Sequence, residues 1–397
     1  MMRFMKVGCC QKAVLLLAIA ANFPAATYGQ TKLAPKKPAA AQKQSASDFD
    51  DIAKRAEAAW KAKQLKDAAA LYRKALKIRP TWQEGWGYLA SSLYQLQRYS
   101  EARDAYRQTT ILTPKNAPSW AYLGLCEYEL RDYQRAFDDL TKAEEIGLGD
   151  DQNVIGQVKY HRAILWDTAG KFELGLGEML WFPHHNLGSP EIFEGIGLSV
   201  LRVPEFPETI PAEKRPMLIL AGQASFAANS QKMDLAAKIY KQLAATYPEE
   251  PNVHFAYGQF LSHVDLDASL KEYEKEIELH PSHVYARIEA SYLYLKQGQL
   301  DKSLSDAQVA AKLAPQIAAP HNLIGRVLLE MDKTSEAIPE LLLATQLAPT
   351  NIPFHMNLAR AYQRAGQTAE AAKQIEIFNE LKKKQAEQQP ENPPPEQ

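Results

Sequence analysis

One proline recurs along this chain at a fixed spacing. Pro80 and Pro114 are 34 residues apart, and the same spacing separates Pro281, Pro315 and Pro349. A period between about 20 and 50 residues predicts a stacked array, because one short unit cannot bury its apolar face without a neighbour. Alanines keep the same phase in the first units, at Ala68, Ala102, Ala136, Ala56 and Ala90, with Gly124 in the third.

Each unit is predicted to be a helical hairpin. The apolar residues follow a helical period, stop at a short turn and resume for a second helix. Small residues such as Ala90 and Ala102 would let the two helices approach closely. The proline at the end of the unit cannot continue the second helix and restricts the residue before it. In the unit 83–116, the two inner faces would be Trp86, Leu89, Ala90 and Leu93, and then Ala102, Ala105, Tyr106 and Thr109.

This pattern resembles the tetratricopeptide repeat, which has a small residue at position 8, Gly at 15, Tyr at 17, Ala at 20 and 27, and Pro at 32. The resemblance implies an all-α fold, a right-handed superhelical solenoid of stacked helix-turn-helix repeats. The units expected are 49–82, 83–116, 117–150, 217–250, 251–283, 284–317 and 318–351, with 352–385 as a capping unit that lacks the terminal proline.

The start of the chain predicts export. Basic residues precede the apolar run 13–23, which is too short to span a bilayer comfortably and ends at Pro24. We expect a signal peptide over 1–29 with cleavage before Gln30; an uncleaved membrane helix is the alternative. The mature protein would then be periplasmic or extracellular, without membrane insertion. The expected segments are a flexible linker (30–47), three repeats (48–150), a degenerate, proline-rich irregular segment (151–216), five repeats including the capping unit (217–385) and a disordered tail (386–397).

Composition and motifs argue against several classes of function. Lys and Arg number 46 against 47 Asp and Glu, so no basic excess suggests nucleic acid. No nucleotide-binding, zinc-hydrolase or serine-hydrolase motif is present, which predicts a protein that is not an enzyme and needs no cofactor. Two histidine pairs, His184 with His185 and His280 with His283, lack completing ligands, so no metal site is expected. Cys126 is interpreted as a small buried hydrophobe.

Two sets of residues are candidates for binding a protein or peptide partner. The resemblance implies that positions 2, 5, 9, 12 and 13 face a concave surface formed by the first helices. Position 12 holds Trp60, Tyr94 and Tyr128, which would form an aromatic ladder along the groove or would instead pack on the neighbouring unit's helix. In the last units the same face carries a polar and basic set suited to a carboxylate or an acidic segment: Asn322, Arg326, Arg360 and Arg364.

The sequence therefore predicts a non-catalytic protein–protein interaction scaffold in a bacterial envelope, with an oligomeric state and a partner that remain open. One alternative is an assembly factor for secretion, pilus or outer-membrane machinery. Another is an envelope enzyme or polysaccharide-binding protein that would use Trp166, Trp181, His184 and His185 of the irregular segment. That segment either covers part of the groove or is a decayed repeat that bends the array, and we favour the decayed repeat.

Overall fold

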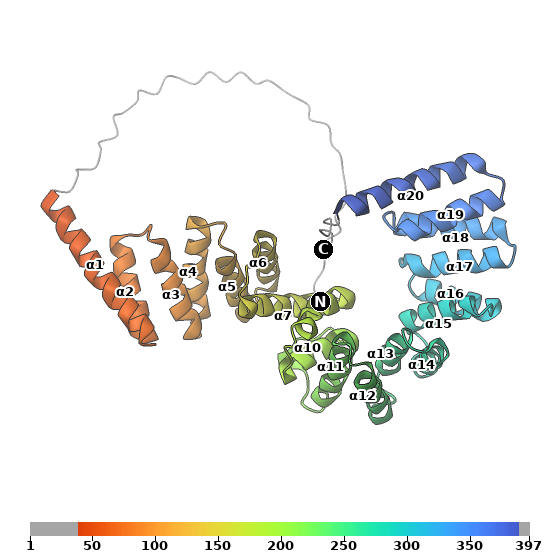
Figure 1. Ribbon diagram of the computed structural model, residues 1–397, viewed down its shortest axis with the longest axis horizontal. Coiled ribbons are helices and arrows are strands. Elements are labelled where there is room, and N and C mark those ends of the chain that lie inside the picture. The colour runs from red at the N-terminus through yellow and green to blue at the C-terminus, as the bar shows by residue number, and fades with distance from the viewer. Residues whose placement is uncertain (1–38, 389–397) are drawn as a thin grey trace, which may run out of the picture. The chain divides into compact units, whose positions relative to one another are not determined.

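The structure, a computed structural model, describes the backbone of residues 39–388 (Figure 1). The expected signal peptide (1–29), the linker as far as residue 38 and the tail from residue 389 lie outside the described residues. The chain divides into a unit of residues 1–51 and a unit of residues 52–397. Of the first unit, only the beginning of helix α1 is described, so everything below concerns the second unit.

The described residues form helices only, as the repeat pattern predicts, apart from turns and one extended segment. The helices in chain order are α1 Ala39–Lys61, α2 Leu65–Ile78, α3 Gln83–Gln95, α4 Tyr99–Leu112, α5 Ala117–Glu129, α6 Tyr133–Ile146, α7 Gln152–Thr168, α8 Phe172–Met179, α9 Trp181–His184, α10 Pro190–Val200, the 3₁₀ helix η1 Pro207–Thr209, α11 Arg215–Asn229, α12 Met233–Thr246, α13 Val253–Leu261, α14 Leu266–Leu279, α15 Val284–Lys296, α16 Leu300–Leu313, α17 Ala318–Glu330, α18 Thr334–Leu347, α19 Ile352–Arg364 and α20 Thr368–Gln388.

The first helices begin where the expected units begin. Helices α3, α5, α15, α17 and α19 start at the first residue of their units, and each is 13 residues long. Helix α1 differs, because it starts at Ala39, inside the stretch expected to be a flexible linker up to residue 47. The sequence there is rich in Ala, Gln and Lys, which are strong helix formers, so the first helix extends backwards into it.

The turn inside each hairpin has a common backbone conformation. Residue 15 of the unit adopts a left-handed φ between 57° and 74°, which reverses the chain after the first helix. Glycine takes this conformation without strain, yet several units place a larger side chain there. The residues are Lys63, Gln97, Arg131, Gly170, Gln231, Gly298, Asp332 and Gly366.

The repeated proline has a second role beyond ending the helix. Its carbonyl oxygen accepts a hydrogen bond from the side chain at position 4 of the next unit, six residues later, so each link fixes one unit to the following one. Tryptophan, histidine and arginine all serve as donors. The pairs are Trp86 to Pro80 (2.8 Å), Trp120 to Pro114 (2.9 Å), His254 to Pro248 (3.0 Å), Arg287 to Pro281 (2.9 Å), His321 to Pro315 (3.2 Å) and His355 to Pro349 (3.0 Å).

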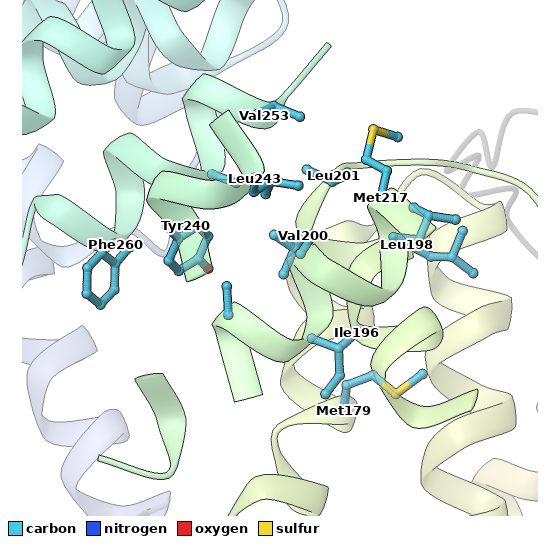
Figure 2. Close-up of a cluster of buried hydrophobic side chains, with 14 of the residues drawn as sticks. Met179, Ile196, Leu198, Val200, Leu201, Met217, Tyr240, Leu243, Val253 and Phe260 are labelled. Carbon is cyan, nitrogen blue, oxygen red and sulfur yellow. The ribbon is translucent and has the colours of Figure 1, made fainter. Parts of the chain in front are cut away.

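The irregular segment 151–216 is built into the core. Figure 2 shows one cluster of buried side chains that joins α8, α10, α11, α12 and α13, with Met179, Ile196 and Leu243 among its members. Helices α10 and α11 approach closely because a Cβ on Gly197 would lie 2.0 Å from the Leu218 carbonyl oxygen. The helix expected from about Pro190 is α10, and the proline-rich stretch 203–216 is helical only in η1 and at the start of α11.

Candidate functional site

The three aromatic residues at position 12 are half-buried between consecutive units. The Trp60 ring meets Tyr88 edge-on at 5.0 Å, Tyr94 meets Tyr122 at 5.2 Å, and Tyr128 meets His161 at 4.6 Å. In each pair the second ring comes from position 6 of the next unit. The contact that the structure shows is thus packing on the neighbouring helix, and no ring contact joins Trp60, Tyr94 and Tyr128 to one another in the described residues.

Half-burial leaves these phenols as neutral hydrogen-bond donors. Burial raises the pKa of Tyr94 and, more strongly, that of Tyr128, so neither ionises near neutral pH. Burial also lowers the pKa of His161, whose Nδ1 lies 2.8 Å from the Gln157 carbonyl oxygen. The aromatic face of units 1 to 3 therefore presents uncharged rings with polar tips, a surface suited to apolar and hydrogen-bonding groups.

The basic residues of the last units line one cavity of about 770 Å³, here called the basic pocket. Arg326 extends from α17, Arg360 and Arg364 extend from α19, and Lys296 joins them from the end of α15. None of these four cations is in an ion pair with a carboxylate of the described residues, although Glu330 also lines the pocket. A partly enclosed set of unpaired cations favours an anionic ligand.

Neighbouring groups fix two of these cations. The Arg326 guanidinium lies 5.7 Å from the centre of the Tyr292 ring and the Lys296 ammonium lies 5.2 Å from it, so one ring holds both charges by cation–π attraction. Arg364 donates to the Leu329 carbonyl oxygen at the end of α17. Arg360 is exposed. The sequence analysis missed Lys296, although its place at position 13 of the unit 284–317 is one of the positions expected to face the groove.

Asn322 does not lie where the sequence analysis placed it. Its side chain is buried, with 6% of the residue exposed, and its Oδ1 accepts a hydrogen bond of 2.8 Å from Asn357 Nδ2. Asn357, in contrast, does line the basic pocket. Position 5 of α17 is covered by α19, so Asn322 orients a pocket residue instead of contacting a ligand itself.

The irregular segment contains a second cavity, of about 590 Å³. Tyr160 and Trp181 lie in its wall, and no lysine or arginine lines it. Trp181 is stacked on His185 at 4.2 Å. Trp166 lies elsewhere, edge-on to Phe137 at 4.7 Å, and His184 is exposed outside the cavity. The set Trp166, Trp181, His184 and His185 is therefore not brought together. Polar members of the wall are Gln152, Asn153, Gln157, Ser189 and Glu191.

The extended segment after α10 contributes a further aromatic ring to the third unit. Phe206 is stacked on Tyr133 at a centroid distance of 4.2 Å and an interplanar angle of 20°, and it lies 6.2 Å from Tyr128. The segment 151–216 therefore combines both interpretations given above, since its helices belong to the core while Phe206 covers the Tyr128 end of the aromatic face.

Other candidate features give no site. Between residues 39 and 388 no group of three or more His, Cys, Asp or Glu side chains is placed to hold a metal ion. In the same range no helix combines the length and the apolar character needed to cross a bilayer. Cys126 is fully buried, and burial raises the pKa of its thiol to about 12, which keeps it protonated and unreactive.

Comparisons with known proteins agree with this geometry. Residues 89–150, which comprise most of the second unit and the third, match the family model described as tetratricopeptide repeat. No curated protein sequence matches the chain significantly. Solved structures that are similar include MamA 41-end from Desulfovibrio magneticus RS-1 (20% identity, 43% of this chain and 96% of that chain, TM-score 0.40) and the APC/C hetero-tetramer Cut9-Hcn1 (12% identity, 84% and 87%, TM-score 0.40). Identities and TM-scores of this size support no inference about function.

Proposed function

The chain is a tetratricopeptide-repeat protein, and from this premise we propose that it is a non-catalytic scaffold that binds an acidic segment of a partner protein in the basic pocket. Repeats of this kind serve protein–protein interaction, which supports the scaffold role in general. The finer statement depends on the charge of one cavity. The envelope location is part of the same proposal and is supported by the signal-like sequence of residues 1–29.

The observation that carries the proposal is the gathering of Lys296, Arg326, Arg360 and Arg364 in one cavity without a described carboxylate partner. Exposed cations usually contribute little to stability, so folding alone gives no reason to collect four of them. Arginine side chains bind carboxylates in a fixed two-pronged geometry, and an extended acidic segment offers several carboxylates in a row. The pocket matches that chemistry in charge and in number of donors.

A binding titration tests the acidic-segment proposal. A fluorescein-labelled hexaglutamate peptide is added to the full-length chain at low salt, and its fluorescence anisotropy is followed. We expect saturable binding that weakens as salt rises, and a loss of at least about tenfold in affinity for the double variant Arg360→Glu, Arg364→Glu.

The matched control is the double variant Lys382→Glu, Lys384→Glu, which makes the same charge change on exposed residues of α20 outside the pocket. It should retain most of the affinity. If both double variants bind the peptide equally, the attraction comes from overall charge and the pocket has no specific role. Crosslinking in the native envelope then identifies the natural partner, which the pocket variant should fail to capture.

A second candidate function has one observation in its favour. The cavity of about 590 Å³ combines Tyr160 and Trp181 with amide side chains and lacks cations, a composition suited to a neutral sugar. Calorimetry with maltotetraose and chitotetraose tests it. Binding that is lost in Trp181→Ala and kept in Trp166→Ala, which lies outside the cavity, would favour a polysaccharide-binding role over the scaffold alone. An absence of heat from both sugars would remove this candidate.

A further inference from the structure

An extended segment of the chain occupies a site on the third unit. Residues 203–210, here called the strap, connect α10 to η1 and α11, and Phe206 has the extended backbone angles φ −74° and ψ 143°. The Phe206 ring is stacked on Tyr133 and meets Tyr128 edge-on. On its other side the strap is held by Arg215, whose guanidinium donates to the Pro207 carbonyl oxygen at 2.6 Å and to Glu194. The strap thus resembles a bound peptide with one aromatic anchor.

The same tyrosine pair is present one repeat earlier. Tyr94 and Tyr99 are 34 residues before Tyr128 and Tyr133 and occupy the same repeat positions, 12 and 17. The rings of Tyr94 and Tyr99 are 5.6 Å apart at 70°, and those of Tyr128 and Tyr133 are 5.5 Å apart at 69°. The two pairs therefore have the same geometry to within 0.1 Å and 1°.

Neighbouring contacts fix both pairs in the same way. The first ring of each pair meets a ring from position 6 of the next unit, Tyr122 in one case and His161 in the other. The second ring of each pair, Tyr99 or Tyr133, is half-buried at the start of a second helix. Tyr133 has Phe206 stacked on it, whereas Tyr99 is in contact with no described ring other than Tyr94.

We propose that the Tyr94–Tyr99 pair binds a phenylalanine side chain from an extended, proline-flanked segment of a partner protein, as Tyr128 and Tyr133 bind Phe206. This inference rests on the proposed scaffold function and names a second element of the partner, separate from the acidic segment. Aromatic anchors carry much of the binding energy at protein interfaces, and proline neighbours keep a segment extended at little entropic cost. The occupied site of the third unit shows which chemistry this geometry accepts.

The occupant is a partner protein and not the strap of a second copy. Phe206 is already in place on its own chain, and Arg215 and Glu194 hold the strap from α11 and α10. Exchange between copies would break these contacts in both chains. Glu129, whose pKa is raised by burial and then by Glu208, is close enough to both pairs that it also raises the pKa of Tyr99. A partner segment without an acidic residue beside its phenylalanine would therefore suit the pair best.

The strap sequence itself supplies the probe. A capped peptide of residues 203–211 (VPEFPETIP) with 4-fluorophenylalanine at the Phe206 position is titrated with the full-length chain, and its ¹⁹F signal is followed. Because the free peptide lacks the tether of the strap, we expect a Kd of roughly 0.1–1 mM for the wild type. Tyr99→Ala should weaken binding at least about tenfold, and Tyr99→Phe, which keeps the ring, should retain it.

Two further chains make the result decisive. Phe206→Ala frees the Tyr128–Tyr133 pair, so the stoichiometry should rise from one peptide to two. Binding of one peptide by Phe206→Ala and of none by the wild type would overturn the proposal, and so would equal affinities of wild type and Tyr99→Ala. A concentration-dependent dimer that Phe206→Ala abolishes would assign the pair to a second copy and overturn it as well. Arg360→Glu, Arg364→Glu should leave peptide binding unchanged, which separates this test from that of the basic pocket.

Discussion

The turn residue at repeat position 15 shows how single residues depart from the family pattern without changing the fold. Lys63, Gln97, Arg131, Gln231 and Asp332 adopt the left-handed conformation that the repeat usually assigns to glycine. A Cβ in this region costs about 1–2 kcal/mol relative to glycine. The surrounding hairpin enforces the conformation, because the two helices that flank the turn are already packed.

Gln231→Gly is therefore expected to stabilise the protein. The φ of Gln231 is 59° and its side chain is exposed, so glycine removes the strain without removing a buried contact. After the larger backbone entropy of glycine in the unfolded chain is subtracted, the gain should be about 0.5–1 kcal/mol. Urea denaturation followed by circular dichroism measures it. As a control, Lys241→Gly in the exposed middle of α12 should cost about 1 kcal/mol. A lower midpoint for Gln231→Gly would contradict this account of the turn.

At the scale of helices, the close approach within a hairpin depends on small residues at fixed positions. Ala90 of α3 and Ala102 of α4 are both fully buried, and so are Ala68 and Ala136 in the neighbouring units. A larger side chain at such a position has no free volume to occupy, because the facing helix is packed against it.

Ala102→Phe should overpack the contact between α3 and α4 and destabilise the protein by about 1–3 kcal/mol or more. Ser100→Phe, on the exposed side of the same helix, provides the control and should change stability by less than about 0.5 kcal/mol. Thermal unfolding curves of the two variants give the comparison. Equal melting temperatures for Ala102→Phe and wild type would mean that the repeat phase assigned to the unit 83–116 is wrong.

The links between units include a group that titrates. His254 Nε2 lies 3.0 Å from the Pro248 carbonyl oxygen, and its Nδ1 lies 2.6 Å from Glu272. Both neighbours are acceptors, so the doubly protonated ring satisfies both. The hydrogen bond to Glu272 accordingly raises the pKa of His254 above its ordinary value. In the last unit His355 makes the same two contacts, but its Nδ1 partner is Gln374, an amide.

Because the pKa of His254 is higher in the folded protein, the link stabilises the fold fully below pH ~6.5 and loses this contribution as pH rises through the folded pKa. Glu272→Gln copies the His355–Gln374 arrangement and should lower the pKa of His254. An NMR titration of the imidazole carbons measures the shift, with His355 as the internal reference. An unchanged His254 pKa in Glu272→Gln would contradict the assignment of Glu272 as the cause.

For the whole molecule, the array separates its candidate binding surfaces along the chain. The uncharged aromatic face belongs to α1 to α6, whereas the basic pocket belongs to α15, α17 and α19. Each consecutive pair of helices depends mainly on its neighbours, so changes at one surface should leave the other intact. A partner that uses both must therefore present two different chemical features.

Export is a prediction about the whole chain that the described residues do not touch. The native protein is expected to begin near Gln30, because the apolar run 13–23 is short and small residues precede the cleavage point. The intact mass of the protein purified from its native source gives the answer. A mass that includes residues 1–20 would contradict cleavage, and recovery in the cytoplasmic fraction would contradict export.

The sequence by itself determined the hairpin, its length and its phase, because a helical apolar period and a proline at one position are local signals that repeat. It also placed Arg326, Arg360 and Arg364 together, since residues 34 apart stack on one face. Only the tertiary structure decided what lies over those positions. α19 buries Asn322, Lys296 completes the basic pocket, and the strap brings Phe206 onto Tyr133 from residues more than 70 positions later. Such contacts depend on how units and connecting segments pack in space, and no spacing along the chain encodes that packing.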